Sequence, residues 1–264
     1  MVNKVIAFTN QKGGVGKTTT CVNLAASLVA AQYKVLLIDL DPQGNATMGS
    51  GIDKTRLDIS VNNVLQEEVN IQEAIISKTP GGFALLGSNS DLTAAEVALL
   101  RRPQQEKNLK KALNGIRSQY EFVVIDCPPS LNMLTLNALV AANSVIIPMQ
   151  CEYYALEGLS ALIGTIEQIQ RSLNPDLTIE GIVRTMYDPR NRLATEISAQ
   201  LIAHFGNKVY QTVIPRNVRL AEAPSHGMPI LLYDKGSRGA ESYMALTREI
   251  LKQYNKLPLL EAVE

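Results

Sequence analysis

The stretch Gln11-Lys12-Gly13-Gly14-Val15-Gly16-Lys17-Thr18-Thr19 decides the fold of this chain of 264 residues. It follows a short apolar run, Val5 to Thr9, that predicts a strand, and it leads into an amphipathic run, Lys17 to Ala31, that predicts a helix. Three glycines within four positions allow backbone dihedrals that other residues avoid, so successive N–H groups can turn inward around phosphate oxygens. Strand, glycine loop, Gly-Lys-Thr and helix in this order predict a phosphate-binding loop.

Each residue type in this loop has its own part in holding a nucleotide. The helix that begins at Lys17 adds unpaired N–H groups and the positive end of its dipole. Lys17 supplies a cation for the β and γ phosphates, and the Thr18 hydroxyl is placed to ligate magnesium. We therefore predict that the chain binds ATP and Mg²⁺, with the nucleotide held by Gly13, Gly14, Val15, Gly16, Lys17, Thr18 and Thr19.

Acidic side chains end two further predicted strands. The run Val35 to Leu40 contains Asp39 and is followed by Asp41, and the alternation of a strand places these two acids on the same side. Two carboxylates there are costly to bury unless they hold a cation or a water, so we expect Asp41 to position the attacking water and Asp39 to lie near the magnesium shell. The run Phe122 to Ile125 leads to Asp126, a Walker B pattern whose carboxylate holds magnesium.

The rest of the chain alternates between short β-branched runs and longer amphipathic stretches. It predicts strands at 83–86, 144–148, 179–184 and 209–214, and helices at 108–119, 156–173 and 194–205. This alternation indicates the α/β class, with a doubly wound, mostly parallel sheet covered by helices on both faces. Because no stretch resembles a linker, we expect residues 1–264 to form a single P-loop ATPase domain.

The composition excludes several other classes of protein. Hydrophobic residues make up 46% and charged residues 19%, which suits a large buried core and not a disordered chain. No apolar run approaches the roughly 18 residues of a membrane helix, and the first ten residues suggest a strand and not an export signal. Three cysteines without a CxxC pair argue against a zinc site, an iron–sulfur cluster or a disulfide framework. A reducing cytoplasm is the expected compartment.

Charge is unevenly distributed along the chain. The net charge is zero, which taken alone speaks against a nucleic-acid partner. Residues 182–240, however, hold eight of the 25 Lys/Arg and four of the 25 Asp/Glu, so the rest holds 17 and 21. The C-terminal third is therefore basic. We expect Arg184 and Arg192 to lie on a solvated face, and the roles of Lys208, Lys235 and Arg238 stay open.

The phosphate loop departs from the common G-x-x-x-x-G-K-[ST] pattern, because Gln11 stands at the first glycine and Lys12 adds a second lysine. This variant resembles the deviant Walker A motif of the family that includes ParA/Soj-type partition ATPases, MinD and nitrogenase iron protein. In that family the extra lysine reaches across a dimer interface to the partner's nucleotide. The resemblance implies a homodimer with ATP and a catalytic role for Lys12, which by itself would be taken for a solvated loop lysine.

Four further segments make the resemblance more specific. D-x-D-P-Q-G-N-A-T from Asp39, D-C-P-P-S from Asp126, and the segments 150–158 and 214–227 are similar to chromosomal ParA/Soj partition ATPases, and the similarity runs from about residue 4 to 254. It implies that Pro215 and Asn217 border the adenine, and that Arg190 and Arg219 contact DNA phosphates. Phosphate contacts carry no sequence information, so the implied binding to double-stranded DNA is non-specific.

The same resemblance implies a cycle and a location. A ParB-type centromere-binding partner would stimulate an otherwise slow hydrolysis of ATP to ADP and so segregate a chromosome origin or plasmid, in the cytoplasm on the nucleoid. The alternative is a MinD-like membrane-associated ATPase, which needs a basic amphipathic C-terminal helix. The segment Lys256 to Glu264 is short, acidic and interrupted by proline, so we expect no stable membrane association. An electron donor of the nitrogenase type needs cysteines facing a dimer axis, and the sequence does not indicate these.

Overall fold

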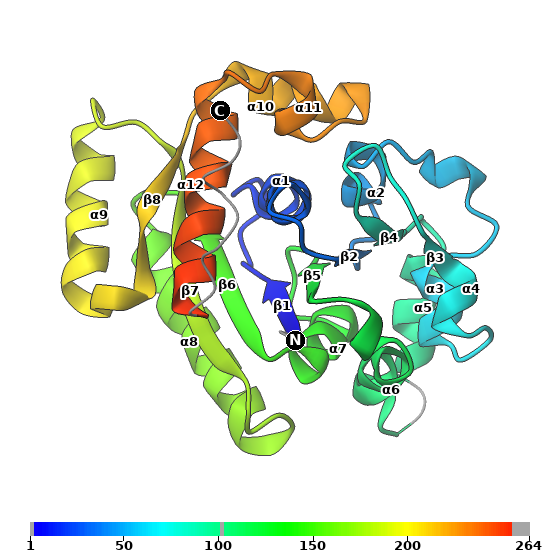
Figure 1. The fold of residues 1–264 in the computed structure, drawn as a ribbon. Coiled ribbons are helices and arrows are strands. Elements are labelled where there is room, and N and C mark those ends of the chain that lie inside the picture. The colour runs from blue at the N-terminus through cyan, green and yellow to red at the C-terminus, as the bar shows by residue number, and fades with distance from the viewer. Residues whose placement is uncertain (1–2, 101–102, 255–264) are drawn as a thin grey trace.

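The computed structural model describes residues 3–100 and 103–254. Within these residues, one sheet of eight strands has the order β3-β4-β2-β5-β1-β6-β7-β8 (Figure 1). The strands are β1 (Lys4–Phe8), β2 (Val35–Asp39), β3 (Ile75–Ile76), β4 (Ala84–Leu86), β5 (Phe122–Asp126), β6 (Ser144–Met149), β7 (Thr178–Tyr187) and β8 (Val209–Pro215). Neighbouring strands are parallel except for β3 with β4.

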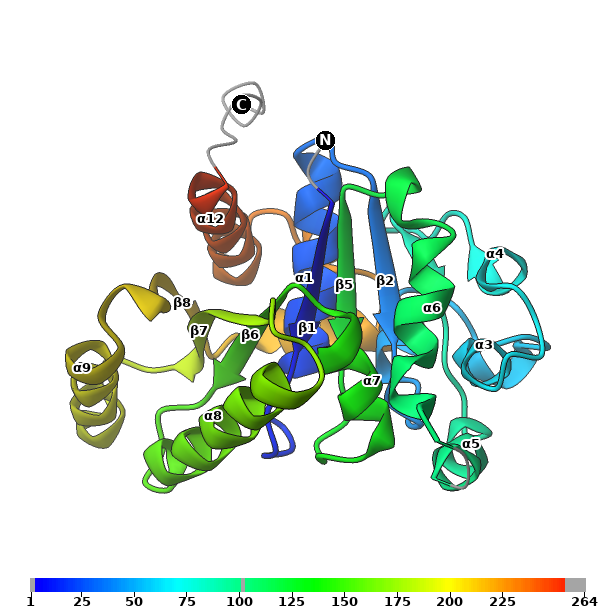
Figure 2. The ribbon, with the colours of Figure 1, turned by 90° about the horizontal axis from the view of Figure 1, so that it is seen from below.

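Helices cover both faces of this sheet. Figures 1 and 2 show α1 and α12 on one side and α6, α7 and α8 on the other. The helices are α1 (Lys17–Ala30), α2 (Asn45–Gly49), α3 (Val61–Leu65), α4 (Ile71–Ala74), α5 (Leu92–Leu99), α6 (Asn108–Asn114), α7 (Met133–Ala141), α8 (Ala155–Ser172), α9 (Arg192–Phe205), α10 (Val218–Glu222), α11 (Ile230–Tyr233) and α12 (Arg238–Gln253). The predicted doubly wound α/β fold is confirmed.

The strands β2 and β5 at the centre of the sheet are buried throughout because both of their faces are covered, and each is apolar up to the aspartate that ends it. All five residues of β2 are buried, and so are all five of β5. Val35 and Leu37 belong to the core that contains α1 and α12, whereas Leu36 and Ile38 belong to the core that contains α6, α7 and α8. Alternate residues of one strand thus pack into two separate cores.

The carboxyl ends of three central strands lie side by side. In the sheet register, Asp126 at the end of β5 lies between Phe8 at the end of β1 and Asp39 at the end of β2. The glycine loop follows β1 directly and leads into α1. Ligands of open α/β sheets bind beyond such strand ends, so this edge is where a site is expected.

The element boundaries differ from the prediction in several places. Strand β2 ends at Asp39 and not at Leu40, and the helix predicted at 108–119 stops at Asn114, before Gly115 and a short 3₁₀ turn. The helices α7 and α12 were not among the predicted stretches. In α12 the buried residues recur at helical spacing, and the Ser237 hydroxyl accepts the N–H of Ala240 as an N-cap, so the sequence did hold a signal for it.

Arg184 is a correction to the expected solvated face. It is 7% exposed, and its guanidinium donates to the Ser198 hydroxyl at 2.8 Å and to the carbonyls of Tyr210 and Gln211 at 2.7 and 2.9 Å. It therefore joins β7 to β8 and to α9 from inside the protein. Arg192, in contrast, is exposed and pairs with Glu196 at 2.8 Å on the outer surface of α9.

Candidate functional site

The phosphate loop adopts the backbone that its glycines predict. Gly14 and Gly16 have φ angles of 73° and 84°, in the left-handed region that side chains disfavour. Gly16 is the N-cap of α1 and offers no side chain to its first N–H groups, so these stay available to a ligand. Among the described residues, no atom lies within 4 Å of a Cβ added to Gly13 or Gly14, so the loop is open on that side.

Lys17 lies inside this loop. It is 7% exposed, and its ammonium group donates to the carbonyl of Lys12 at 3.2 Å. Burial lowers the pKa of Lys17, and the charge of the neighbouring Asp126 opposes that shift. An anionic phosphate would compete well with a neutral carbonyl for this cation.

Asp126 is a buried carboxylate whose hydrogen bonding is incomplete. One oxygen, Oδ1, accepts a weak bond from the Cys21 thiol at 3.6 Å, and Oδ2 has no hydrogen-bond partner among the described residues. Burial and then the charge of Asp39 raise the pKa of Asp126 to about 8, while the nearby Thr18 hydroxyl lowers it. A divalent cation beside Thr18 and Asp126 would satisfy the free oxygen and balance the charge, so these residues fit magnesium.

Asp39 lies beside Asp126 but uses its oxygens within the chain. Oδ1 accepts the N–H of Asp41 at 3.1 Å, and Oδ2 accepts the N–H and the hydroxyl of Thr47 at 2.8 and 2.7 Å. Burial raises the pKa of Asp39 to about 6, and the bonds from Thr47 oppose this. Asp39 thus stabilises the loop between β2 and α2 through these hydrogen bonds. Its place near the magnesium shell stays a prediction.

Asp41 lies beyond the end of β2, so the turn and not the strand pleat sets its direction. Its side chain is 8% exposed, and Oδ1 accepts the N–H of Gln43 at 2.9 Å. Its charge opposes the lowering of the Lys17 pKa and adds to the raised pKa of Asp126, so its carboxylate lies near both groups. Its role with the attacking water stays a prediction.

A cavity of about 200 Å³ lies next to the loop. It brings the predicted adenine residues Pro215 and Asn217 together with Gly16 and Thr19. It is smaller than the roughly 300–1,000 Å³ of pockets for drug-sized ligands, which suits one ring system and not a whole nucleotide. The Asn217 side-chain oxygen accepts the N–H of Leu220 and so caps α10, which fixes this wall.

Two residues of this region were missed at the level of sequence. The Thr185 hydroxyl donates to the carbonyl of Val15 at 2.7 Å, which ties β7 to the phosphate loop. Met186 lines the 200 Å³ cavity with a φ angle of 48°, which is unusual for a residue other than glycine. The strand that contains both was predicted to end at Arg184, directly before Thr185.

Lys12 is exposed and forms an ion pair with Glu152 of the same chain. Its backbone N–H donates to the Asn10 side chain at 3.0 Å. Glu152 lies in the segment 150–158, which was singled out for resemblance alone, without a role for this residue. The predicted reach of Lys12 across a dimer interface stays a prediction.

The two predicted DNA contacts are both exposed and both paired with acids. Arg190 binds Asp188 through two bonds, at 2.9 and 2.8 Å, and these bonds lower the pKa of Asp188 to about 2. Arg219 lies 2.9 Å from Glu222 and 3.4 Å from Asp234. A DNA phosphate would have to take the place of these carboxylates, a competition that the sequence alone does not indicate.

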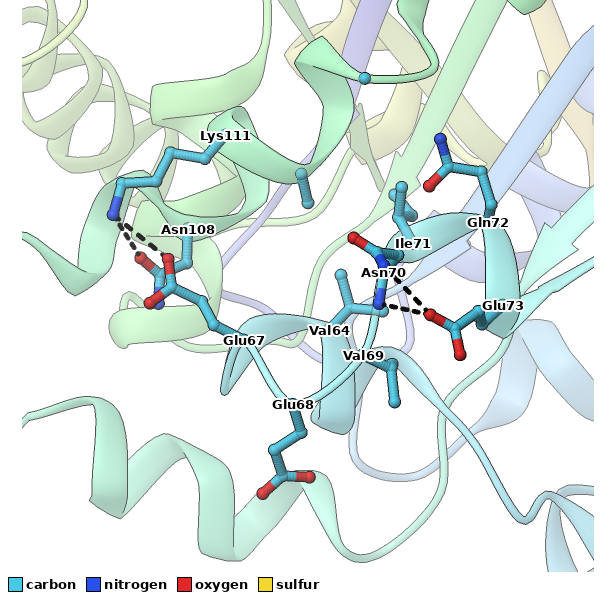
Figure 3. Close-up of a pocket in the computed structure, with 12 residues that line it drawn as sticks. Val64, Glu67, Glu68, Val69, Asn70, Ile71, Gln72, Glu73, Asn108 and Lys111 are labelled. Carbon is cyan, nitrogen blue, oxygen red and sulfur yellow. Dashed lines mark hydrogen bonds and ion pairs between the residues drawn. The ribbon is translucent and has the colours of Figure 1, made fainter.

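A larger cavity, of about 450 Å³, lies away from the loop (Figure 3). Its walls come from α3, α4 and α6 and include Glu67, Glu73 and Lys111, and it contains none of the predicted site residues.

Across residues 3–100 and 103–254, no helix is both long and apolar enough to span a membrane.

A buried parallel sheet, a glycine loop between β1 and α1, and acids at the ends of β2 and β5 define the class of P-loop nucleotide-binding proteins. Residues 3–179 match a family model described as an AAA domain. The sporulation initiation inhibitor protein Soj of Bacillus subtilis is 50% identical over 94% of this chain and 98% of its own length. The chromosome partitioning protein ParA of Myxococcus xanthus is 48% identical over 96% and 89%.

The chain belongs to the ParA/Soj family of chromosome partitioning ATPases. Solved structures agree with its fold. Cobyrinic acid a,c-diamide synthase from Mycobacterium smegmatis, with bound ATP analog and magnesium, has a TM-score of 0.85 and 37% identity over 98% of both chains. The cell division ATPase MinD of Pyrococcus furiosus has a TM-score of 0.79 at 24% identity over 96% of this chain and 100% of its own, which shows a shared fold alone.

Proposed function

We propose that this protein is an ATP-dependent partition protein that dimerises on ATP, binds DNA without sequence preference and is released by hydrolysis. The observation that carries the proposal is the open loop of left-handed glycines beside the free, buried oxygen of Asp126. It supports binding of a nucleotide with its metal. The relatives named Soj and ParA are 48–50% identical to this chain, whereas the cobyrinic acid a,c-diamide synthase is 37% identical. The higher identity makes the partitioning proteins the better guide to function.

In this proposal the loop residues 13–19 hold ATP, with Lys17 on the β and γ phosphates and with Pro215 and Asn217 against the adenine. Magnesium, when bound, would draw charge from the phosphates, and Thr18 and Asp126 would hold it, with Asp39 nearby. Asp41 orients the water for attack. Turnover is slow without a partner, since no second water-positioning group was identified in the sequence.

The dimer links the nucleotide to DNA. Lys12 reaches the nucleotide of the partner subunit, and assembly doubles the number of arginines on one face. Arg190 and Arg219 of both subunits then contact phosphates of double-stranded DNA. A ParB-type centromere-binding protein stimulates hydrolysis, and the chain works as a single domain, 1–264, in the cytoplasm on the nucleoid.

Gel filtration with no nucleotide, with ADP and with ATP, followed by DNA binding on each sample, tests the proposal. We expect a dimer with ATP alone, and DNA binding by that sample alone. Lys17→Ala is the control and should stay monomeric in all three conditions. A wild-type protein that binds DNA equally well in all conditions would contradict the proposed switch.

The alternative, a MinD-like membrane ATPase, depends on the segment 256–264, which lies outside the described residues. Sedimentation with anionic vesicles tests it directly. Recovery of the ATP-bound protein with the vesicles and not with DNA would replace the partition proposal by this alternative.

A further inference from the structure

Lys12 and Glu152 lie 140 residues apart in the chain and meet at the edge of the site. The Lys12 ammonium contacts the Glu152 carboxylate, and each side chain is 50% exposed. A second contact joins the phosphate loop to the end of β6, because the Asn10 amide donates to the carbonyl of Pro148 at 2.8 Å while its oxygen accepts the N–H of Lys12. This second contact holds Lys12 near Glu152 independently of the ion pair.

Lys12 is also connected to the phosphate site. Its carbonyl accepts the ammonium of Lys17 at 3.2 Å, so residue 12 is held at its carbonyl and at its side chain. Phosphate oxygens would draw Lys17 away from that carbonyl. After this exchange the N–H of Lys12 is still bonded to Asn10, and the pair with Glu152 is what retains the Lys12 ammonium in its own subunit.

We propose that Glu152 is a positioning residue that holds Lys12 within the monomer and so opposes ATP-dependent dimerisation. The inference rests on the proposed role of Lys12 at the partner's nucleotide. Lys12 must leave Glu152 before it can reach across an interface, so the pair raises the ATP concentration and the protein concentration that assembly requires. Both side chains are half-exposed, which lets them exchange partners without opening the core.

The expected size of this effect follows from the exposure of the pair. An exposed ion pair changes an equilibrium by about 1.4- to 5-fold. Two such pairs, one in each subunit, break when a dimer forms, so their loss should lower the dissociation constant of the dimer by about 2- to 30-fold. Screening makes the effect smaller at high salt.

The chain offers a matched control. Lys111 and Glu67 form an ion pair at 3.3 Å with both side chains 55% exposed, at the cavity of Figure 3 and away from the phosphate loop. Glu67→Gln removes the same charge from a pair of similar exposure. It should leave the dimer unchanged.

The first experiment examines the monomer without nucleotide. Acetylation of lysine amines is followed by mass spectrometry of the peptide that contains Lys12, in the wild type, Glu152→Gln and Glu67→Gln. We expect faster acetylation of Lys12 in Glu152→Gln alone. Equal rates for Lys12 in all three proteins would overturn the proposal, whatever the protein does with ATP.

The second experiment measures the dissociation constant of the ATP-bound dimer by analytical ultracentrifugation. Glu152→Gln should tighten it by about 2- to 30-fold relative to the wild type and to Glu67→Gln. In a Lys12→Gln background, at protein concentrations raised until that weaker dimer forms, it should have no effect. A weaker dimer, or an equal effect in both backgrounds, would show that Glu152 does not act by retaining Lys12. A wild-type protein that fails to dimerise with ATP would instead count against the proposed function.

Discussion

Replacing Arg219 with alanine should halve the salt dependence of DNA binding. If Arg190 and Arg219 of both subunits each neutralise one phosphate, four contacts form, and a slope near −0.9 per contact gives log K against log salt of about −3.6. Raising salt from about 50 to 200 mM then weakens binding by about 150-fold. With two contacts removed, the slope falls to about −1.8 and the weakening to about 12-fold.

The ion pairs in the structure make these values upper limits. Arg219 is shared between Glu222 and Asp234, and an arginine that keeps its carboxylate neutralises less phosphate charge. The assay is fluorescence anisotropy of two unrelated duplexes across a salt series, with the ATP-bound dimer. The slope should change equally on both duplexes, because phosphate contacts read no bases.

Arg192→Ala is the matched control for this prediction. Arg192 is also an exposed arginine in an ion pair, on α9, and it is not among the predicted DNA contacts. Arg219 adjoins Leu220 and Ala221, which line the 200 Å³ cavity, so nucleotide binding must be measured in parallel. An Arg219→Ala protein that loses ATP, or one that keeps its slope, would refute the reasoning.

Four other outcomes follow from the site and the core. Asp41→Ala should bind ATP and accumulate as a dimer, and loss of ATP binding would mean that the wrong carboxylate was chosen. Lys12→Ala should bind ATP with modest loss while hydrolysis and dimerisation fall much further; unchanged turnover at saturating ATP would leave Lys12 an ordinary loop lysine. The wild type should turn over well below the roughly 1–100 per second of kinases when DNA and partner are absent, which a phosphate-release assay measures. Arg184→Met should lower the free energy of unfolding by about 3 kcal/mol, because it leaves a buried hydroxyl and two carbonyls without their hydrogen-bond donor. The midpoint of thermal unfolding should fall by about 6–12 °C.

The parts of the site that depend on local backbone were predictable. Gly14 and Gly16 can adopt the left-handed backbone of the loop without strain, and the apolar runs before the loop and before Asp126 suffice for buried strands. The order of motifs along the chain therefore predicted both the fold and the edge of the sheet that carries the site.

The parts that depend on which segments meet in space were not predictable from one sequence. Arg184 looked like a surface cation until β8 and α9 provided carbonyls and a hydroxyl for it. Glu152 acquires its contact with Lys12 from the neighbouring positions of β1 and β6. The direction of Asp41 depends on a turn, which the strand pattern does not describe.

The end of β7 connects the nucleotide site to the predicted DNA contact Arg190 through one short stretch of chain. The Thr185 hydroxyl touches the phosphate loop, Met186 lines the cavity beside it, and Arg190 stands only five residues after Thr185. Even fully extended, that stretch spans no more than about 18 Å. A movement of the loop can thus reach the Asp188–Arg190 turn through consecutive peptide bonds, so communication between them requires no relay of side chains through either core.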